Sequence, residues 1–273
     1  MWFDSASVLR VGLAADHIVV AKGRHRGPGN PAVGSVQAWS AAHGGSPWNE
    51  ALQALSKEMT GQLKGARRVE VVLSNRLVRW QLLAVPPQLV SLPERQVFAQ
   101  SHFASVYGKR AENWLCTSSS PSHQTAVPAC AVESALIFSL QAVCAEHGVE
   151  LRSVVPYWSH AVDHWQSQIR EDVYWLAQAE PDMLTLGLVH KNAWLGLRSI
   201  RTGGDLVGSL GSLQTQMLLA LDGQVQGITG AIPVYAMGNH NALETHQSTQ
   251  FRVLQPRHSA FTTTPQWRLA WGI

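Results

Sequence analysis

The chain has 273 residues, enough for two domains that each bury a core of their own. Hydrophobic residues make up 45% of the sequence and charged residues 14%, which excludes a largely disordered protein. The net charge is +3, and the Lys and Arg residues are scattered without a basic run. This distribution argues against nucleic-acid binding.

The first part of the chain has a pattern of three short strands followed by a helix. Short β-rich runs bounded by Gly, Asn, Asp or Pro predict consecutive hairpins and therefore antiparallel strands. We expect strands at 8–14, 17–22 and 34–40, with a tight turn at Ala15-Asp16, then a helix at 47–63 and a strand at 68–74.

A segment at 75–131 then interrupts the simple pattern. A small inserted α+β subdomain accounts for its elements. They are a strand at 77–85, a helix that Ser91 opens and Gly108 ends, and two strands at 113–118 and 125–131. The main pattern resumes with a helix at 132–147, a strand at 151–155 and a helix at 157–170.

The same order of elements begins again at Val173. The sequence predicts strands at 173–179, 183–190 and 193–200, a helix at 206–221, a strand at 232–236, a helix at 242–247, a strand at 251–254 and a final helix after Thr264-Pro265. Both copies are βββαβαβα, the order of a ribonuclease-H-like unit, and a tandem pair of such units makes the α/β actin-like fold. We expect a first domain at 1–157 and a second at 158–273, with the last helix packed back on the first.

Three stretches resemble the actin-like proteins of pilus and secretion assembly. They are VEVVLSNRLVRWQLLAVP, LPERQVFAQSHFASVYGKRAENW and PACAVESALIFSLQAVCAEHGVELRSVVPYW. This group comprises the PilM proteins of type IV pili, their relatives in mannose-sensitive haemagglutinin pili, and the cytoplasmic domain of the GspL proteins of type II secretion. The similarity covers roughly residues 8 to 200 and is thin afterwards.

The resemblance implies a cytoplasmic platform at the inner membrane. Such a platform holds the N-terminal peptide of a PilN-like membrane protein or docks an assembly ATPase. In PilM-like proteins the peptide groove lies on the first domain beside the inserted subdomain. The candidate contacts here are Arg76, Arg79, Phe98, His102 and Phe103, although the helical face that carries the last three would serve equally as core.

The resemblance also raises the question of ATP, which active actin-like proteins bind with two glycine-rich hairpins. Backbone N–H groups in these hairpins cradle phosphates, and acidic residues hold magnesium through water. The first hairpin keeps Gly12 and Asp16 but lacks the hydroxyl and the further carboxylate, and Pro181 removes an N–H donor from the second. The adenosine segment keeps a single glycine, Gly238.

We therefore expect no catalytic residue and no cofactor. If Mg-ATP binding were retained, Gly12, Asp16, Gly203 and Gly238 would surround the nucleotide. Asp16 is equally an ordinary turn residue.

No metal site is expected either. The three cysteines are widely spaced and odd in number, and no glutamate stands between His160 and His164 in the manner of a zinc protease. The first strand offers no carboxylate for nuclease chemistry with two metals.

The N-terminus lacks a secretory signal and no apolar window is long enough to span a bilayer, so we expect a cytoplasmic protein, peripheral to the inner membrane through a partner. The leading hypothesis is a non-catalytic actin-like scaffold in type IV pilus or type II secretion biogenesis. One alternative is an ATP-binding switch. Another is a structural subunit that associates with itself or with another actin-like chain through aromatic helices, with Trp158, Trp165, Trp267 and Trp271 as candidates.

Overall fold

A computed structural model describes residues 8–23, 33–38, 46–61, 66–120, 126–221, 231–238, 251–254 and 268–270. The expected helix at 242–247, the start of the final helix, Trp267 and Trp271 lie outside these residues. Two expected elements differ in length. The strand expected at 77–85 is the shorter β5 (Arg79–Leu83) after a 3-10 turn, η1 (Asn75–Leu77). The helix expected at 157–170 is α4 (Tyr157–Trp165) followed by a 3-10 turn, η3 (Gln166–Gln168).

Two compact units can be separated by their internal contacts. Unit 1 comprises Met1–Leu77, Glu133–His164 and Pro256–Ile273, and unit 2 comprises Val78–Val132 and Trp165–Gln255. Each unit therefore combines segments from distant parts of the sequence. The domain boundaries expected from the sequence stay a prediction.

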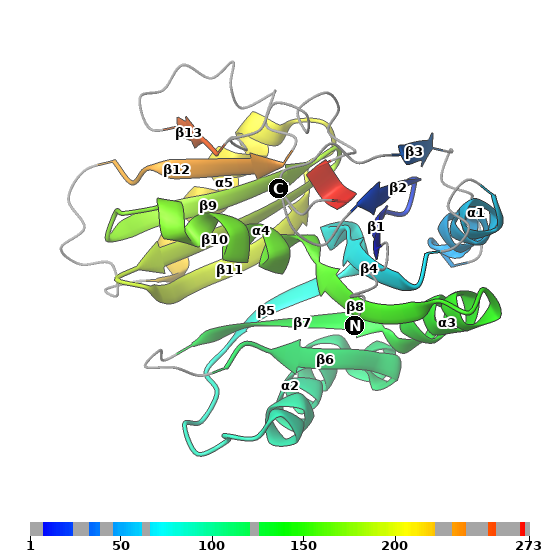
Figure 1. Ribbon diagram of the computed structural model, residues 1–273. Helices are drawn as coiled ribbons and strands as arrows, with labels where there is room; N and C mark the ends of the chain where they lie inside the picture. Colours follow the sequence, from blue (N-terminus) through cyan, green and yellow to red (C-terminus); the bar gives the residue numbers. More distant parts are fainter. Residues whose placement is uncertain are drawn as a thin grey trace, which may run out of the picture. The chain divides into compact units, whose positions relative to one another are not determined.

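Unit 1 contains a five-stranded sheet in the order β3-β2-β1-β4-β8 (Figure 1). Its strands are β1 (Val8–Leu13), β2 (His17–Gly23), β3 (Val33–Ala38), β4 (Arg68–Leu73) and β8 (Glu150–Pro156). The first three strands are antiparallel hairpins, whereas β4 is parallel to both β1 and β8. The helices α1 (Asn49–Thr60) and α3 (Ser134–Glu146) contact β2 and β8, respectively.

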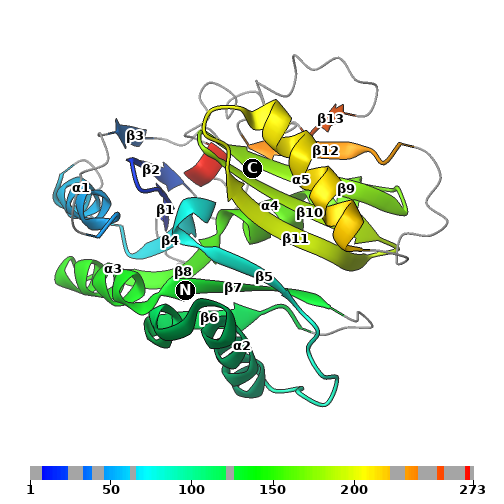
Figure 2. The same cartoon turned by 180° about the vertical axis from the view of Figure 1, so that it is seen from behind.

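Unit 2 contains a second five-stranded sheet in the order β11-β10-β9-β12-β13. Its strands are β9 (Val173–Glu180), β10 (Met183–His190), β11 (Ala193–Arg201), β12 (Val234–Gly238) and β13 (Phe251–Val253). The helix α5 (Leu206–Ala220) covers one face of this sheet (Figure 2), where Leu210, Leu213 and Met217 join the core. Burial of such side chains stabilises the fold by roughly 1.5–3 kcal/mol each.

The two sheets repeat one topology, which confirms the duplication expected from the sequence. In each copy the first strand is antiparallel to the second and parallel to the fourth, and the fifth strand is parallel to the fourth. The hairpin turn at Lys191-Asn192 has positive φ at both residues, 49° and 63°, the backbone of a two-residue turn between twisted strands.

The inserted subdomain is also confirmed and belongs to unit 2. Its sheet has the order β5-β7-β6, with β6 (Trp114–Ser118), β7 (Val127–Glu133) and the helix α2 (Leu92–Tyr107) beside a 3-10 segment, η2 (Gly108–Asn113). Phe103 and Ala99 of α2 are completely buried in the core that this sheet forms with the helix. Subdomain and second sheet therefore form separate cores within one unit.

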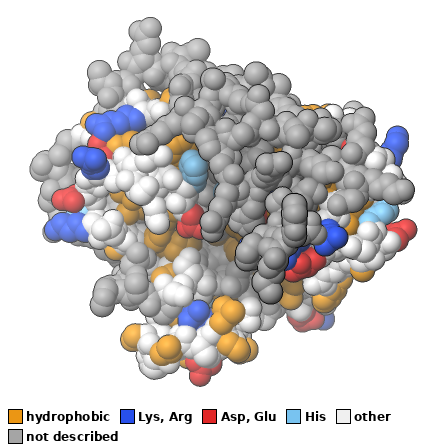
Figure 3. Space-filling model, viewed as in Figure 1, with side chains coloured by type: hydrophobic (Ala, Val, Ile, Leu, Met, Phe, Trp, Pro, Cys, Tyr) orange, Lys and Arg blue, Asp and Glu red, His pale blue; other side chains and the backbone are white. Residues whose placement is uncertain are grey.

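Several hydrophobic side chains of this subdomain face solvent. Val90, Val97 and Leu92 are 74%, 71% and 49% exposed. In Figure 3 hydrophobic side chains gather at the lower end of the view, where Figure 1 draws α2 and β6. In the part of the chain that is described, no helix is long and apolar enough to cross a membrane.

A capping box fixes the first turn of α2. The Ser91 side chain accepts a hydrogen bond from the Glu94 backbone N–H at 3.3 Å, and the Ser91 backbone N–H donates to the Glu94 carboxylate at 3.1 Å. These contacts satisfy backbone donors that a helix start leaves unpaired. The helix therefore begins where Ser91 predicts.

Replacement of this cap should weaken α2 locally. We expect Ser91→Ala to lower the free energy of local unfolding of α2 by about 1 kcal/mol, because the first turn loses an acceptor. Hydrogen exchange of the α2 backbone amides measures this change. Ser101→Ala, in the exposed middle of the same helix, is the matched control and should not accelerate exchange.

Candidate functional site

The candidate site of unit 1 lies where β1 and β4 end. These strands are parallel, and Leu13 is in register with Leu73. Their carboxyl ends therefore meet at one edge of the sheet, the place where open α/β sheets bind ligands. The β1–β2 turn and η1 follow these ends directly, and the Ser74 backbone N–H donates to the Leu13 carbonyl at 2.9 Å.

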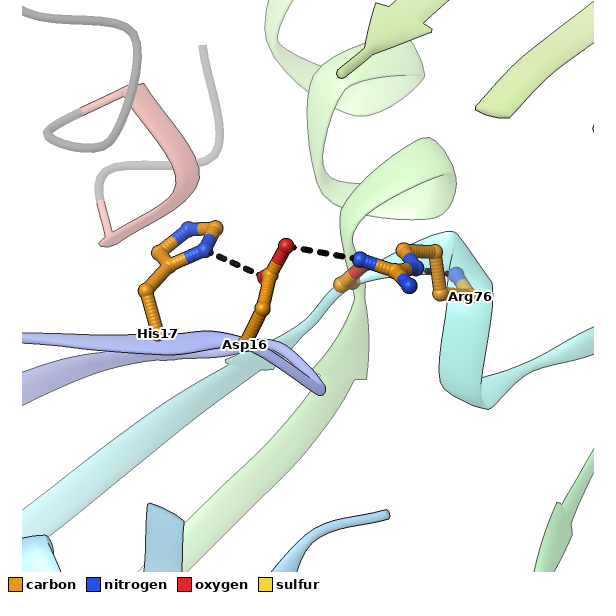
Figure 4. Close-up of polar contacts among 4 residues, drawn as sticks. Asp16, His17 and Arg76 are labelled. Carbon is orange, nitrogen blue, oxygen red and sulfur yellow. Dashed lines mark hydrogen bonds and ion pairs between the residues drawn. The ribbon is translucent and has the colours of Figure 1, made fainter. Parts of the chain in front are cut away.

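Asp16 is the charged centre of this edge (Figure 4). Arg76 Nη1 donates to its Oδ2 at 2.8 Å, and His17 Nδ1 donates to its Oδ1 at 2.7 Å. The Arg76 side chain is only 15% exposed, so this ion pair is better shielded from water than a surface pair. The carboxylate is thus satisfied by two side chains of its own unit.

The pKa of Asp16 is lowered by this arrangement. The hydrogen bond from His17 is the main cause, the positive charge of Arg76 adds to it, and partial burial opposes both. The ionised carboxylate is the form that the network stabilises.

Gly12, the other candidate from the first hairpin, packs against the C-terminal segment of the same unit. A Cβ placed on Gly12 would lie 2.6 Å from the Ala270 backbone nitrogen and 2.9 Å from Leu269 Cγ. Ala270 and Leu269 are buried. The missing side chain of Gly12 therefore makes room for another part of the backbone.

The equivalent edge of unit 2 carries the two remaining candidates, Gly203 and Gly238, with β10 and β9 between their strands. The strands β9, β11 and β12 all run in one direction, Gly238 is in register with Ala179, and Gly203 follows β11. A hydrogen bond from the Thr202 N–H to the Asp182 carbonyl, at 3.0 Å, ties the Gly203 loop to the β9–β10 turn.

These glycines adopt backbone conformations that favour glycine. Gly203, Gly204 and Gly238 have φ of 57°, 94° and 75°, and no atom of the described residues lies within 4 Å of a Cβ placed on Gly203 or Gly204. The side chain of Asp205 accepts from the Gly208 N–H at 2.9 Å and caps α5. The expectation that no cofactor binds stays a prediction, and so does the alternative in which Gly12, Asp16, Gly203 and Gly238 surround Mg-ATP.

The described residues contain no group of three or more His, Cys, Asp and Glu side chains that could hold a metal. Burial raises the pKa of Cys116 and Cys144 to about 11 and that of Cys130 to about 12, which keeps these thiols protonated and poor as ligands or nucleophiles.

The residues expected to contact a partner lie in different environments. Arg79 is exposed, Phe98 and His102 are half-buried, and Phe103 is completely buried. Arg76 binds Asp16. The expectation that Phe103 lies on an exposed face is therefore wrong. Its side chain belongs to the core, which was the other use that the sequence pattern allowed for this helical face.

The tryptophans of α4 are also buried, so the expectation that they form a contact surface is wrong for them. Trp158 and Trp165 are each 1% exposed, which places their side chains in the interior and not on a surface for self-association. The pairing of Asp16 with Arg76 and the contact of Gly12 with Ala270 were not expected from the sequence. The single available signal was that Arg76 stands two residues after the strand expected at 68–74.

Solved structures resemble this chain in fold. The PilM-PilN type IV pilus biogenesis complex matches with a TM-score of 0.64 and 12% identity, over 98% of this chain and 97% of the other. A Bacteroides thetaiotaomicron protein with an actin-like ATPase fold and unknown function matches with a TM-score of 0.57 and 13% identity, over 93% and 94%.

The cytoplasmic domain of EpsL, an inner-membrane component of the Vibrio cholerae type II secretion system, matches with a TM-score of 0.55 and 12% identity, over 98% and 94%. No protein-family model and no curated protein matches the sequence. At these identities the matches establish the α/β actin-like fold with its two mixed sheets and small antiparallel sheet.

The contact of Gly12 with the C-terminal segment gives a direct prediction. Gly12→Ala should lower the free energy of unfolding by about 1–3 kcal/mol, because the new methyl group meets backbone atoms that cannot rotate away. Urea denaturation measures the loss. Gly211→Ala, on exposed α5 with no atom within 4 Å of the added Cβ, should be neutral or stabilising by up to about 1 kcal/mol. Equal stability of Gly12→Ala and the native chain would contradict the packing role.

The Asp16 network predicts a pH dependence. A carboxyl whose pKa is lower in the folded chain contributes stability above its unfolded pKa, near the ordinary value of 3.8, and this contribution is lost as the pH falls through the folded pKa. Asp16→Asn should therefore destabilise the protein at neutral pH, and the difference from the native chain should shrink below that ordinary value.

Urea denaturation at several pH values tests this dependence, with Asp163→Asn, at an exposed position of α4, as the control. A double-mutant cycle of Asp16→Asn with Arg76→Gln should give a coupling of about 1 kcal/mol at neutral pH. A coupling near zero would mean that the ion pair contributes nothing.

Proposed function

We propose that this chain is a non-catalytic, actin-like scaffold of a type IV pilus or type II secretion machine. In this role it binds the cytoplasmic N-terminal peptide of a PilN-like inner-membrane protein, or docks an assembly ATPase, and stays in the cytoplasm beside the membrane. The fold that it shares with the PilM-PilN complex and with EpsL supports this role at the level of architecture.

The single observation that carries the non-catalytic part is the closed edge of unit 1. Asp16, the acidic group that remains in the first hairpin, is bound by Arg76 and His17 of the same unit. Binding of a hydrated magnesium ion there would have to break this network, and desolvated charge-assisted hydrogen bonds are costly to lose. The place beside Gly12 is filled by Ala270.

A second candidate, an ATP-binding switch, is favoured by the open edge of unit 2. Gly203 and Gly204 combine positive φ with free space, and their loop precedes the N-terminus of α5. Backbone N–H groups at such a place suit a phosphate. The two candidates differ in one measurable property, the affinity for Mg-ATP.

Calorimetric titration of the purified chain discriminates between them. We expect no heat of binding with Mg-ATP and a dissociation constant on the order of micromolar with a peptide from the cytoplasmic N-terminus of a PilN-like protein encoded beside this chain. Tight binding of Mg-ATP would promote the switch, and Arg76→Gln tests whether the ion pair is what prevents it. Absence of peptide binding would contradict the scaffold with this partner.

A further inference from the structure

Unit 2 contains a groove of about 500 Å³ that none of the assignments above uses. Figure 2 shows the three elements that surround it, β5, β11 and α5. Its walls are Gln81 and Leu82 of β5, residues 195–198 and 200 of β11, Leu213, Gln216, Met217 and Ala220 of α5, and Leu221 directly after that helix. The volume falls within the range of ligand sites. Five residue steps along β11 give the groove a length of roughly 17 Å, which fits a short extended chain and not a compact metabolite.

Most of the surface inside the groove is aliphatic. Leucines of β5, β11 and α5 line it together with Met217, and Gly196 leaves the floor without a side chain. Leu219, one turn beyond Gln216 on α5, is 74% exposed and extends the apolar surface outside the lining. Contact with aliphatic side chains of a ligand would remove this surface from water.

Three polar side chains complete the lining. Arg198 is the single charged side chain among the described lining residues, and it has no hydrogen-bond or ion-pair partner in the described part of the chain. Gln216, on α5, likewise has no partner among the described residues. Gln81, on β5, donates through Nε2 to the Tyr107 hydroxyl at 3.3 Å, which leaves its Oε1 to accept a hydrogen bond.

We propose that the groove between β5, β11 and α5 binds an extended peptide segment that carries aliphatic side chains beside an aspartate or glutamate. The guanidinium of Arg198 matches a carboxylate, and no acid among the described lining residues competes for it. Gln81 and Gln216 come from different walls, β5 and α5, and a side-chain amide has both the donor and the acceptor that a peptide unit needs. A fatty acyl chain would use the apolar walls but neither amide.

This inference shares with the proposed function the idea that the chain binds a peptide, but it does not require a PilN-like partner. It also places the peptide on unit 2, whereas the resemblance to PilM proteins implies the first domain. The two ideas can therefore fail independently.

A phage-displayed library of random peptides, selected on the immobilised full chain, is the first probe. Enriched peptides should contain aliphatic residues next to Asp or Glu. The most enriched sequence is then synthesised with an amidated C-terminus, so that its side chain supplies the carboxylate, and its affinity is measured by fluorescence polarisation.

Variants of the groove then test the assignment. Arg198→Gln should weaken binding roughly tenfold or more, since a charge-assisted hydrogen bond is lost. Ala220→Trp, at an exposed lining position, should block the groove without disturbing the core. Arg201→Gln, an exposed arginine at the end of β11 outside the lining, is the matched control and should leave the affinity unchanged.

A charge swap in the peptide makes the result specific. Replacement of its acid by the corresponding amide should weaken binding to the native chain but not further weaken binding to Arg198→Gln. Failure of the library to enrich any peptide, or equal affinity of the native chain and both groove variants, would overturn the inference. If the PilN-like peptide binds the native chain and both groove variants with equal affinity, the proposed function stands and its site lies outside the groove. If the selected peptide binds the groove variants more weakly while the PilN-like peptide does not bind at all, the groove is a peptide site and the proposed function with this partner fails.

Discussion

The parallel pairing of the first and fourth strand in each sheet is the constraint on which the candidate sites depend. This pairing brings loops that are distant in sequence to a single edge of each sheet. The strands end in register there, with Leu13 beside Leu73 in unit 1 and Ala179 beside Gly238 in unit 2. A shift of this register by one residue would exchange the two faces of a strand. The buried side chains of the strands therefore also fix where the polar residues after them meet.

Duplication has left the two edges chemically different. The edge of unit 1 is occupied by its own residues, because Arg76 neutralises Asp16 and the C-terminal segment covers Gly12. The edge of unit 2 keeps glycines with positive φ, and no other described residue fills the space beside Gly203 and Gly204. The same fold thus carries one edge whose polar groups are bound by residues of the same unit and one edge whose glycines are not covered by described residues. This difference is expected because function resides in individual sites and not in the architecture.

Local signals in the sequence explain how much of the fold could be predicted. Short β-rich runs between turn residues predicted the strands of both sheets. Ser91 and Glu94 predicted the start of α2, and Gly148, with φ of 63°, marked the end of α3. Repetition of the order βββαβαβα then gave the topology. Each of these features depends on residues that are near one another in sequence.

The site could be predicted only in part, because its contacts join residues far apart in sequence. Composition and spacing carry no information on whether Arg76 points toward Asp16 or toward a partner, and both are ordinary uses of an arginine. The face of α2 that carries Phe103 has the same periodicity whether it contacts the subdomain core or a ligand. The groove beside α5 was missed for a related reason, since β5, β11 and α5 come from three separate segments.

The contact between Gly12 and Ala270 has a consequence for how the protein is made. Unit 1 includes both the first strand and the segment with Leu269 and Ala270, so its hydrophobic interior stays incomplete until that segment has been synthesised. Unit 2 is encoded entirely between these two ends and can fold earlier during synthesis. During that interval the apolar strands β1 and β2 lack the segment that covers Gly12, and long-range closure of this kind is slow. Loss of the segment with Leu269 and Ala270 would therefore uncover Gly12, so the damage would appear in the first strand, more than 250 residues earlier in the sequence.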